Sequence, residues 1–357
     1  MPNNSPPCVT REGLQAKKAI AARTSFANYG FYLGATNDNI AEIEAATTAD
    51  ACGIKVFMGA STGNMLVDDE KTLDAIFARA RLPVVTHCES TPLILEAEAR
   101  AREKYGDDVP MSEHPNIRSA EACYRSSSFA VDLARRHGTR LHVLHLTTAR
   151  EMELFSAGPI ADKQITAEVC IHHLWFDESD YEALGSKIKC NPAVKSRADR
   201  DALRKAVASD VIDIIATDHA PHTLEEKSRR YFEAPAGLPL VQHSLNMMIE
   251  LWRDGHLRSL EQIAEKAAHN PATRFGIVDR GFIREGYFAD LAVVDLDGRT
   301  RIEAENILYK CGWSPMQGLT MRSNVHMTVL GGEIVYADGR VAAAPRGRAL
   351  EFKGADR

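Results

Sequence analysis

VIDIIATDHAPH (residues 211–222) is the stretch that decides the fold, because a short apolar run ends there on acidic and imidazole side chains. Three other runs have the same form: GIKVFMG (53–59), LPVVTHCE (82–89) and LHVLHLTT (141–148). Apolar, β-branched runs of this length are typical of buried parallel strands. In a barrel of parallel strands the strand ends converge on one face, where such enzymes carry their chemistry. The pattern therefore predicts one mouth shared by Lys55, His87, His145 and Asp218.

From residue 10 to residue 274, short apolar runs alternate with amphipathic stretches, which indicates βα units with parallel pairing. The expected strands are Ser25–Leu33, Ile54–Met58, Val84–His87, Leu141–Leu146, Ile165–Val169 and Ile212–Ala216. The expected helices include Ile40–Cys52, Asp69–Ala80, Arg118–His137 and Ser259–Ala268. Because a (β/α)8 barrel needs eight strands, we predict a TIM-like barrel whose first strands precede residue 1. The alternative is an open sheet with two exposed edges.

The pattern of apolar and turn residues changes near residue 281. FIREGYFADLAVVDLD (282–297) and HMTVLGGEIVYADGR (326–340) have the pattern of short strands joined by Gly and Asp turns. We therefore predict two parts: the barrel at residues 1–281, which carries the candidate site, and a small β-rich module at residues 282–357 that packs on it.

Composition and charge limit the class of protein. The 357 residues are 45% hydrophobic with a formal net charge of -6, which gives no reason to expect nucleic acid or an anionic membrane as partner. No run is apolar for long enough to span a bilayer, and the N-terminus lacks the features of a secretory signal. The seven cysteines are scattered without CxxC spacing, which favours reduced thiols in a cytoplasmic protein. A homodimer is compatible with this composition.

The strand-end residues are of types that hold divalent metals. A carboxylate after an apolar strand, such as Asp218, is costly to bury without compensation, although a helix N-cap is the alternative role. His87 and His145 each end an apolar run, and neutral imidazoles in such a mouth suit zinc. His142 should point to the opposite side of its strand from His145 by alternation, so we expect it to be structural.

Lys55 is unusual because its ammonium lies within the apolar strand GIKVF. Burial disfavours the charged form, and a neutral amine can add carbon dioxide to give a carbamate that bridges two cations. A salt bridge is the alternative for an isolated strand lysine. Three other candidate metal ligands are expected at the same mouth, which favours the carbamate over the salt bridge.

Eight motifs occur in a family-specific order: MPNNSPP, GIKVFMGASTGN, THCE, HLTT, AEVCIHHL, KCNPAVKS, ATDHAPH and YKCGWSPMQG. Through them the chain resembles the dihydroorotases of the amidohydrolase superfamily, specifically the long bacterial type. The motifs CNPAVK and KCGWSP separate this group from hydantoinases and allantoinases, which are the alternatives within the superfamily.

The resemblance implies a zinc-dependent enzyme that interconverts dihydroorotate and N-carbamoyl-aspartate in pyrimidine biosynthesis. It implies two Zn2+ ions bridged by carboxylated Lys55, with His87 and His145 on the second ion. Asp218 would bind metal and shuttle the proton. The residues that would hold the substrate are Asn3, Asn191 and His222, with backbone contacts from Ala220. For Glu168 and the pair His172–His173, packing and a direct role are both open.

One departure from the family concerns its first strand, which carries an HxH motif and an arginine. This chain has no histidine before His87. It is therefore either a fragment of an active enzyme or a diverged homologue, such as a non-catalytic subunit that scaffolds another pyrimidine enzyme. We expect weak or absent activity for the chain as given, with one metal ion held by His87, His145 and either Lys55 or Asp218.

Overall fold

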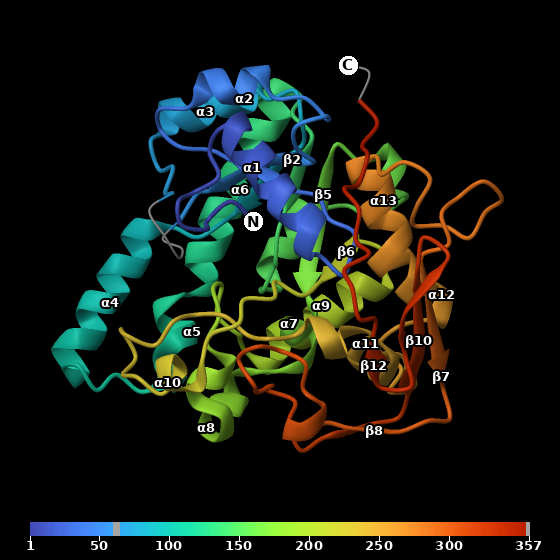
Figure 1. Ribbon diagram of the computed structural model, residues 1–357. Coiled ribbons are helices and arrows are strands. Elements are labelled where there is room, and N and C mark those ends of the chain that lie inside the picture. Colours follow the sequence, from blue (N-terminus) through green and yellow to red (C-terminus); the bar gives the residue numbers. More distant parts are fainter. Residues whose placement is uncertain (60–64, 355–357) are drawn as a thin grey trace.

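The computed structural model describes residues 1–59 and 65–354 and has an α/β fold of the TIM-barrel type, followed by an antiparallel sheet (Figure 1). Part of the GIKVFMGASTGN motif, residues 60–64, lies outside the described residues. Six parallel strands pair in chain order, so their carboxyl ends meet at one edge. They are β1 (Tyr32–Gly34), β2 (Gly53–Phe57), β3 (Val84–His87), β4 (Leu141–Val143), β5 (Ile165–Cys170) and β6 (Ile214–Ala216). The predicted fold class is confirmed.

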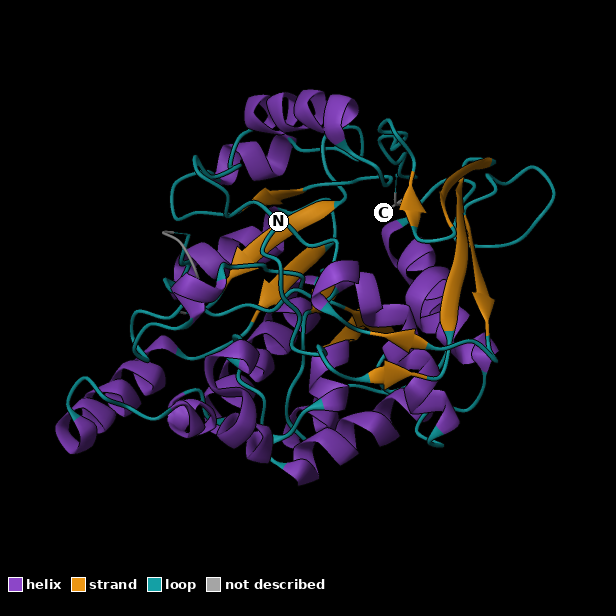
Figure 2. Ribbon diagram, turned by 60° about the horizontal axis from the view of Figure 1, so that its bottom comes forward, coloured by secondary structure: helices purple, strands orange, loops and turns teal. Residues whose placement is uncertain are grey.

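Helices surround the parallel strands, as Figure 2 shows. The first half of the chain contributes α1 (Arg11–Thr24), α2 (Ile40–Ala45), α3 (Glu70–Arg79), α4 (Thr91–Tyr105), α5 (His114–Ile117) and α6 (Ala120–His137). The second half contributes α7 (Ile171–Trp175), α8 (Tyr181–Leu184), α9 (Arg197–Ala208), α10 (Leu224–Lys227), α11 (Ser244–Arg253), α12 (Leu260–Ala264) and α13 (Asn270–Phe275). Within the described residues, no helix is long and apolar enough to cross a membrane.

Local sequence explains where α6 begins and ends. The side chain of Ser119 accepts a hydrogen bond from the backbone N–H of Ala122, which caps the first turn. The helix stops at Gly138, whose φ of 68° is a left-handed conformation that glycine adopts without strain. Small and branched side chains on one face are buried against the core, including Ala130 and Val131. The helix therefore covers the sheet with an apolar stripe.

Some predicted bounds were wrong for reasons of local pairing. Residues 25–31 are not part of β1, because Tyr29 bonds instead to the C-terminal segment through Arg348 and Leu350. The helix expected to reach Cys52 ends at Ala45. Its sequel is a turn in which Thr47 donates its backbone N–H and its hydroxyl to Asp50.

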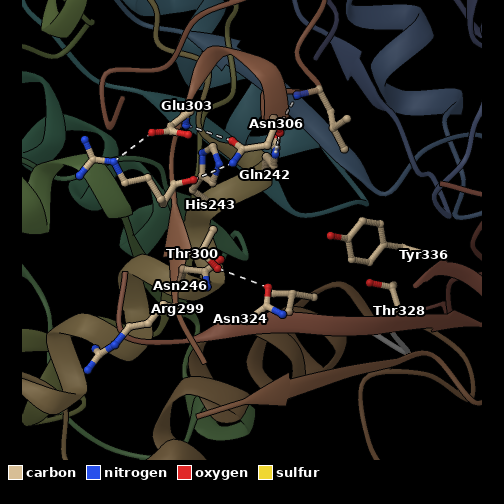
Figure 3. A pocket seen from close by; sticks show the side chains of 13 residues that line it. Gln242, His243, Asn246, Arg299, Thr300, Glu303, Asn306, Asn324, Thr328 and Tyr336 are labelled. Carbon is tan, nitrogen blue, oxygen red and sulfur yellow. Dashed lines mark hydrogen bonds and ion pairs between the residues drawn. The ribbon is translucent and has the colours of Figure 1, made fainter. Parts of the chain in front are cut away.

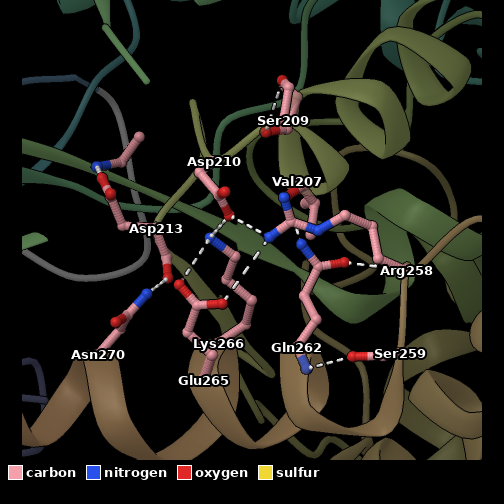
Figure 4. Close-up of polar contacts among 12 residues, drawn as sticks. Val207, Ser209, Asp210, Asp213, Arg258, Ser259, Gln262, Glu265, Lys266 and Asn270 are labelled. Atoms are coloured by element: carbon pink, nitrogen blue, oxygen red, sulfur yellow. Dashed lines mark hydrogen bonds and ion pairs between the residues drawn. The ribbon is translucent and has the colours of Figure 1, made fainter. Parts of the chain in front are cut away.

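The helix predicted at 259–268 is not uniform, and an ion pair forms where its geometry changes. After α12 the chain makes a π-helical turn, Glu265–His269, in which Lys266 is buried and its Nζ lies 2.8 Å from Oδ1 of Asp210 (Figure 4). Arg258 donates to the same carboxylate oxygen at 2.9 Å. Asp210 lies just beyond α9, so these contacts tie α12 to the segment that leads into β6.

The C-terminal segment forms a second sheet at one side of the molecule (Figures 1 and 2). Its strands are β7 (Leu291–Asp295), β10 (Asn324–Leu330), β11 (Glu333–Ala337) and β12 (Arg340–Val341), with β8 (Thr300–Arg301) and β9 (Thr320–Met321) as a separate pair. Ile302, Met316 and Met321 are buried in the same apolar core as the barrel strands. The module therefore packs on the barrel, and the boundary at residue 281 stays a prediction.

Candidate active site

A small cavity lies at the carboxyl ends of the parallel strands and has a volume of about 70 Å³. It is lined by Met1, Asn3, Lys55, Phe57, His87, His145, Asn191, Asp218, Ala220, Ala236 and Gly237. Seven of the eight predicted site residues are in this set; His222 is not. Strands that are separated by long stretches of sequence thus deliver their polar ends to one place.

Lys55 and Asp218 form an electrostatic pair in this cavity. Lys55 is 1% exposed, and burial lowers its pKa to about 8, although the nearby Asp218 carboxylate opposes the shift. Burial likewise raises the pKa of Asp218 to about 6, against the effect of the lysine. A lysine with such a pKa has a substantial neutral fraction near pH 7–8, which is the form that reacts with carbon dioxide. The aspartate is suited to taking up and releasing a proton near neutral pH.

His87 and His145 face each other across the cavity, with Nδ1 of His87 3.2 Å from Nε2 of His145. Two nitrogens bound tetrahedrally to one zinc at about 2.0–2.1 Å lie about 3.3 Å apart, so this pair fits a shared ion. Burial lowers the pKa of both rings, which keeps them neutral and able to donate a lone pair.

Glu89 orients the first of these histidines. Its carboxylate accepts from Nε2 of His87 at 3.0 Å, which leaves the lone pair of His87 on Nδ1, and it also pairs with Arg118. Burial alone would raise the pKa of Glu89, but Arg118 and His87 outweigh burial and lower it to about 2. Sequence reasoning did not assign Glu89 a role, although the His-x-Glu spacing in THCE was a usable signal.

Two of the predicted ligands have an unusual backbone conformation. His145 has a φ of 38° and Asp218 a φ of 43°, in the left-handed region that L-residues seldom occupy. Such conformations cost about 1–3 kcal/mol each and cluster at functional sites. The left-handed turns follow directly after β4 and β6, and they place these side chains at the cavity.

The predicted substrate-binding residues occupy different positions. Asn191 lines the cavity, and its buried Oδ1 has no hydrogen-bond partner among the described residues, so it is free for a ligand. Asn3 is exposed at the cavity rim. The N–H of Ala220 donates to the carbonyl of Leu238 at 3.1 Å, which leaves the carbonyl of Ala220 as its available backbone group.

His222 is not among the residues that line the cavity, and its substrate-binding role stays a prediction. Its ring is next to Gly237, where an added Cβ would come within 3.2 Å of the His222 ring and 2.4 Å of the carbonyl oxygen of Ala220. The indole N–H of Trp313 donates to the carbonyl of His222 at 2.7 Å. The absence of a side chain at Gly237 therefore lets its segment approach the segment of Ala220 and His222 closely. The sequence analysis did not identify Gly237.

Glu168 and the pair His172–His173 are not among the residues that line the cavity. Glu168 accepts from His142 at 3.2 Å on the inner side of the barrel. His142 lies in register with Val85, which pairs with Lys55, so His142 points to the inner side of the barrel. Both histidines of the LHVLH run therefore face inward, contrary to the alternation argument.

A larger cavity of about 470 Å³ lies between the start of α11 and the C-terminal strands (Figure 3). His243 and Asn246 face it from the barrel side, and Asn324 and Tyr336 face it from the second sheet. Its carboxylate, Glu303, is paired with Arg301 at 3.1 Å. The cavity at the strand ends, with its paired histidines and its coupled Lys55 and Asp218, is the better candidate for catalysis.

The chain is similar to known proteins in both sequence and structure. The model of the amidohydrolase family matches residues 15–335. A dihydroorotase of Pyrococcus furiosus is 31% identical over 359 residues, covering 100% of this chain and 77% of the relative. An allantoinase of Solibacter usitatus is 30% identical, covering 99% and 78%. The solved L-hydantoinase of Arthrobacter aurescens superposes with a TM-score of 0.90 at 26% identity, covering 98% and 79%.

Proposed function

The chain belongs to the amidohydrolase family, and from this premise we propose that it is a dihydroorotase. It would hydrolyse the cyclic amide of dihydroorotate to N-carbamoyl-aspartate and close the same ring in reverse. The observation that carries the proposal is the cavity in which His87 and His145 are spaced for one metal ion beside the pair Lys55 and Asp218.

The choice of dihydroorotate among cyclic amides is supported by two sequence motifs and their positions. CNPAVK contains Asn191, whose unpartnered Oδ1 lies at the cavity. KCGWSP contains Trp313, which is 1% exposed and holds the carbonyl of His222. CNPAVK thus contributes a residue to the cavity lining, and KCGWSP holds a segment next to it.

The residues present fit a metal ion, as the spacing of the two imidazole nitrogens and the carboxylate behind His87 indicate. His87, His145, Asp218 and a carboxylated Lys55 would hold zinc. When bound, the metal supplies Lewis-acid chemistry, polarising the amide carbonyl and lowering the pKa of the attacking water.

Asp218 would carry the proton in both halves of the reaction. It accepts the proton of the water as the water oxygen bonds to the ring carbonyl carbon. It then delivers that proton to the ring nitrogen as the C–N bond breaks, so protons and charge balance. Asn191 and the carbonyl of Ala220 orient the ring, which lowers the entropic cost of reaching the reactive geometry.

A substrate panel tests the proposal. With zinc supplied, the chain should give its highest kcat/KM on dihydroorotate, with lower values on allantoin and on hydantoins. A preference for allantoin or for an uncharged hydantoin would replace dihydroorotase by that activity. Turnover should be weak, because the family's HxH motif has no counterpart in this chain. No turnover together with no binding of dihydroorotate in a folded, zinc-loaded protein would favour the non-catalytic subunit.

A further inference from the structure

A second cluster of metal-binding side chains lies where β5 runs into α7, outside the cavity described above. Cys170, His172 and His173 are 0%, 1% and 3% exposed. One ligand atom from each side chain lies within 4.8 Å of the other two. The cluster is thus compact and closed to solvent, although none of its members lines the candidate active site.

The imidazoles of this cluster have unused nitrogens. Neither nitrogen of His172 has a hydrogen-bond partner within the described part of the chain, and Nδ1 of His173 also has none. Burying a polar group without a partner costs about 1–3 kcal/mol. Three such ring nitrogens close together are therefore unusual in a folded protein. Since each neutral ring carries one N–H, two of the three atoms are lone pairs, one on each histidine, and a bound cation would give both of them a partner.

The hydrogen bonding of His173 prepares it for this role. Its Nε2 donates to the carbonyl of Pro192 at 3.1 Å, which assigns the proton to Nε2 and the lone pair to Nδ1. Metal-bound histidines in proteins typically donate their other N–H to a carbonyl or carboxylate in this way. Burial lowers the pKa of both His172 and His173, so the rings stay neutral ligands.

We propose that Cys170, His172 and His173 bind one thiophilic metal ion of the Zn2+ or Cu+ class. This site has its own ligands but lies beside the catalytic centre, since Cys170 interacts electrostatically with Asp218 and Lys55 and His173 interacts with His145. One thiolate and two imidazoles are the soft and borderline ligands that these ions prefer. Burial raises the pKa of the Cys170 thiol well above its usual value, so binding must expel the thiol proton to solvent. The ion would tie the end of β5 to the first turn of α7.

Binding of Co2+ distinguishes this site from the catalytic centre by its absorption spectrum. Protein stripped of metal by a chelator is titrated with Co2+, and the near-ultraviolet thiolate-to-cobalt charge-transfer band is recorded. Lys55, His87, His145 and Asp218 include no thiol, so cobalt held by them gives no such band. We expect the intensity of the band at saturation to correspond to one thiolate-bound cobalt ion per chain, and cobalt taken up by the catalytic centre to add nothing to it.

Variants assign the ligands. Cys170→Ser should abolish the band, and His173→Gln should weaken or abolish it. Cys52→Ser is the matched control, because Cys52 is also buried but bonds to the carbonyl of Phe31, and it should leave the band intact. Circular dichroism checks that each variant is folded.

The proposal is overturned if the wild-type protein gives no thiolate band, a result that needs no variant. It is also overturned if the band survives in Cys170→Ser or disappears in Cys190→Ser while Cys170→Ser keeps it; Cys190 is the neighbouring thiol, 3.6 Å from Nε2 of His173. None of these outcomes depends on hydrolytic activity, so the dihydroorotase proposal stands or fails separately.

Discussion

Asp218 combines a strained backbone, a raised pKa and a place in the cavity, and this combination predicts the effect of removing its charge. Asp218→Asn keeps the size of the side chain but cannot accept the proton of the attacking water. We expect kcat to fall roughly 10²–10⁴-fold with a much smaller change in substrate binding. Steady-state kinetics and equilibrium binding of dihydroorotate measure the two effects.

Asp213 provides the control for Asp218, since Asp213 lies just before β6 and Asp218 just after it. Its carboxylate is buried and bonds to Lys163 at 2.7 Å and to the N–H of Ala167 at 2.9 Å, away from the cavity. Asp213→Asn should lower stability and leave kcat per folded molecule near the wild-type value. Near-normal turnover in Asp218→Asn would reject its proton role.

His243 makes stability depend on pH. It is 2% exposed with neither ring nitrogen bonded among the described residues, and burial lowers its pKa to about 4. In the unfolded chain this histidine has its ordinary pKa of about 6.5. Between pH 4 and pH 6.5 it is therefore protonated in the unfolded state but neutral in the folded state. Stability should therefore fall by about 1–2 kcal/mol from this residue as pH drops from 7 to 5.

The variant His243→Leu removes this titration. Urea unfolding of wild type and variant at pH 7 and pH 5 gives the difference between their pH dependences. The variant should lose about 1–2 kcal/mol less than the wild type on acidification. Equal losses in the two proteins would mean that His243 does not titrate differently on folding.

At the scale of the element, the cap of α6 is a test of local sequence. Ser119→Ala removes the side chain that accepts from the N–H of Ala122 and should reduce the free energy of unfolding by about 1 kcal/mol. Ser128→Ala in the same helix removes a hydroxyl that only bonds back to Arg125, and it should be neutral or slightly stabilising. Chemical denaturation compares the two, and an equal loss in both would exclude capping as the cause.

The ends of the strands show where the alternation of side chains no longer predicts the direction of a residue. Val84–His87 is a strand as predicted, because its apolar residues are buried on both faces. The strand predicted at 141–146 ends at Val143, and the left-handed turn at His145 then reverses the expected direction of that side chain. Alternation holds only while the strand continues, and the sequence contains no separate signal for that end.

At the scale of the whole molecule, metal should stabilise the fold. The candidate ligands come from β2, β3 and the segments after β4 and β6, which only the folded chain brings together. Binding to the folded state alone adds about 2.7 kcal/mol when the free ion is at 100 times its Kd. Urea unfolding with zinc and with a chelator should differ by this order.

His87→Asn tests whether that gain arises at the predicted centre. The variant removes one imidazole of the pair whose nitrogens lie 3.2 Å apart, so the zinc-dependent gain should shrink. An unchanged gain would place the stabilising ion elsewhere in the molecule.

The sequence by itself determined the parallel α/β class, most of the strand positions and the residue types of the candidate metal ligands, whose role stays a prediction. These follow from apolar runs and from residue chemistry, which are local properties of the chain. Only the tertiary structure decided that Gly237 lies against the ring of His222 and that Glu89 orients His87. It also decided that Cys170 meets His172 and His173, of whose four ring nitrogens three have no hydrogen-bond partner among the described residues. Distances between side chains and the supply of partners for buried polar groups depend on packing between distant segments, which no local pattern records.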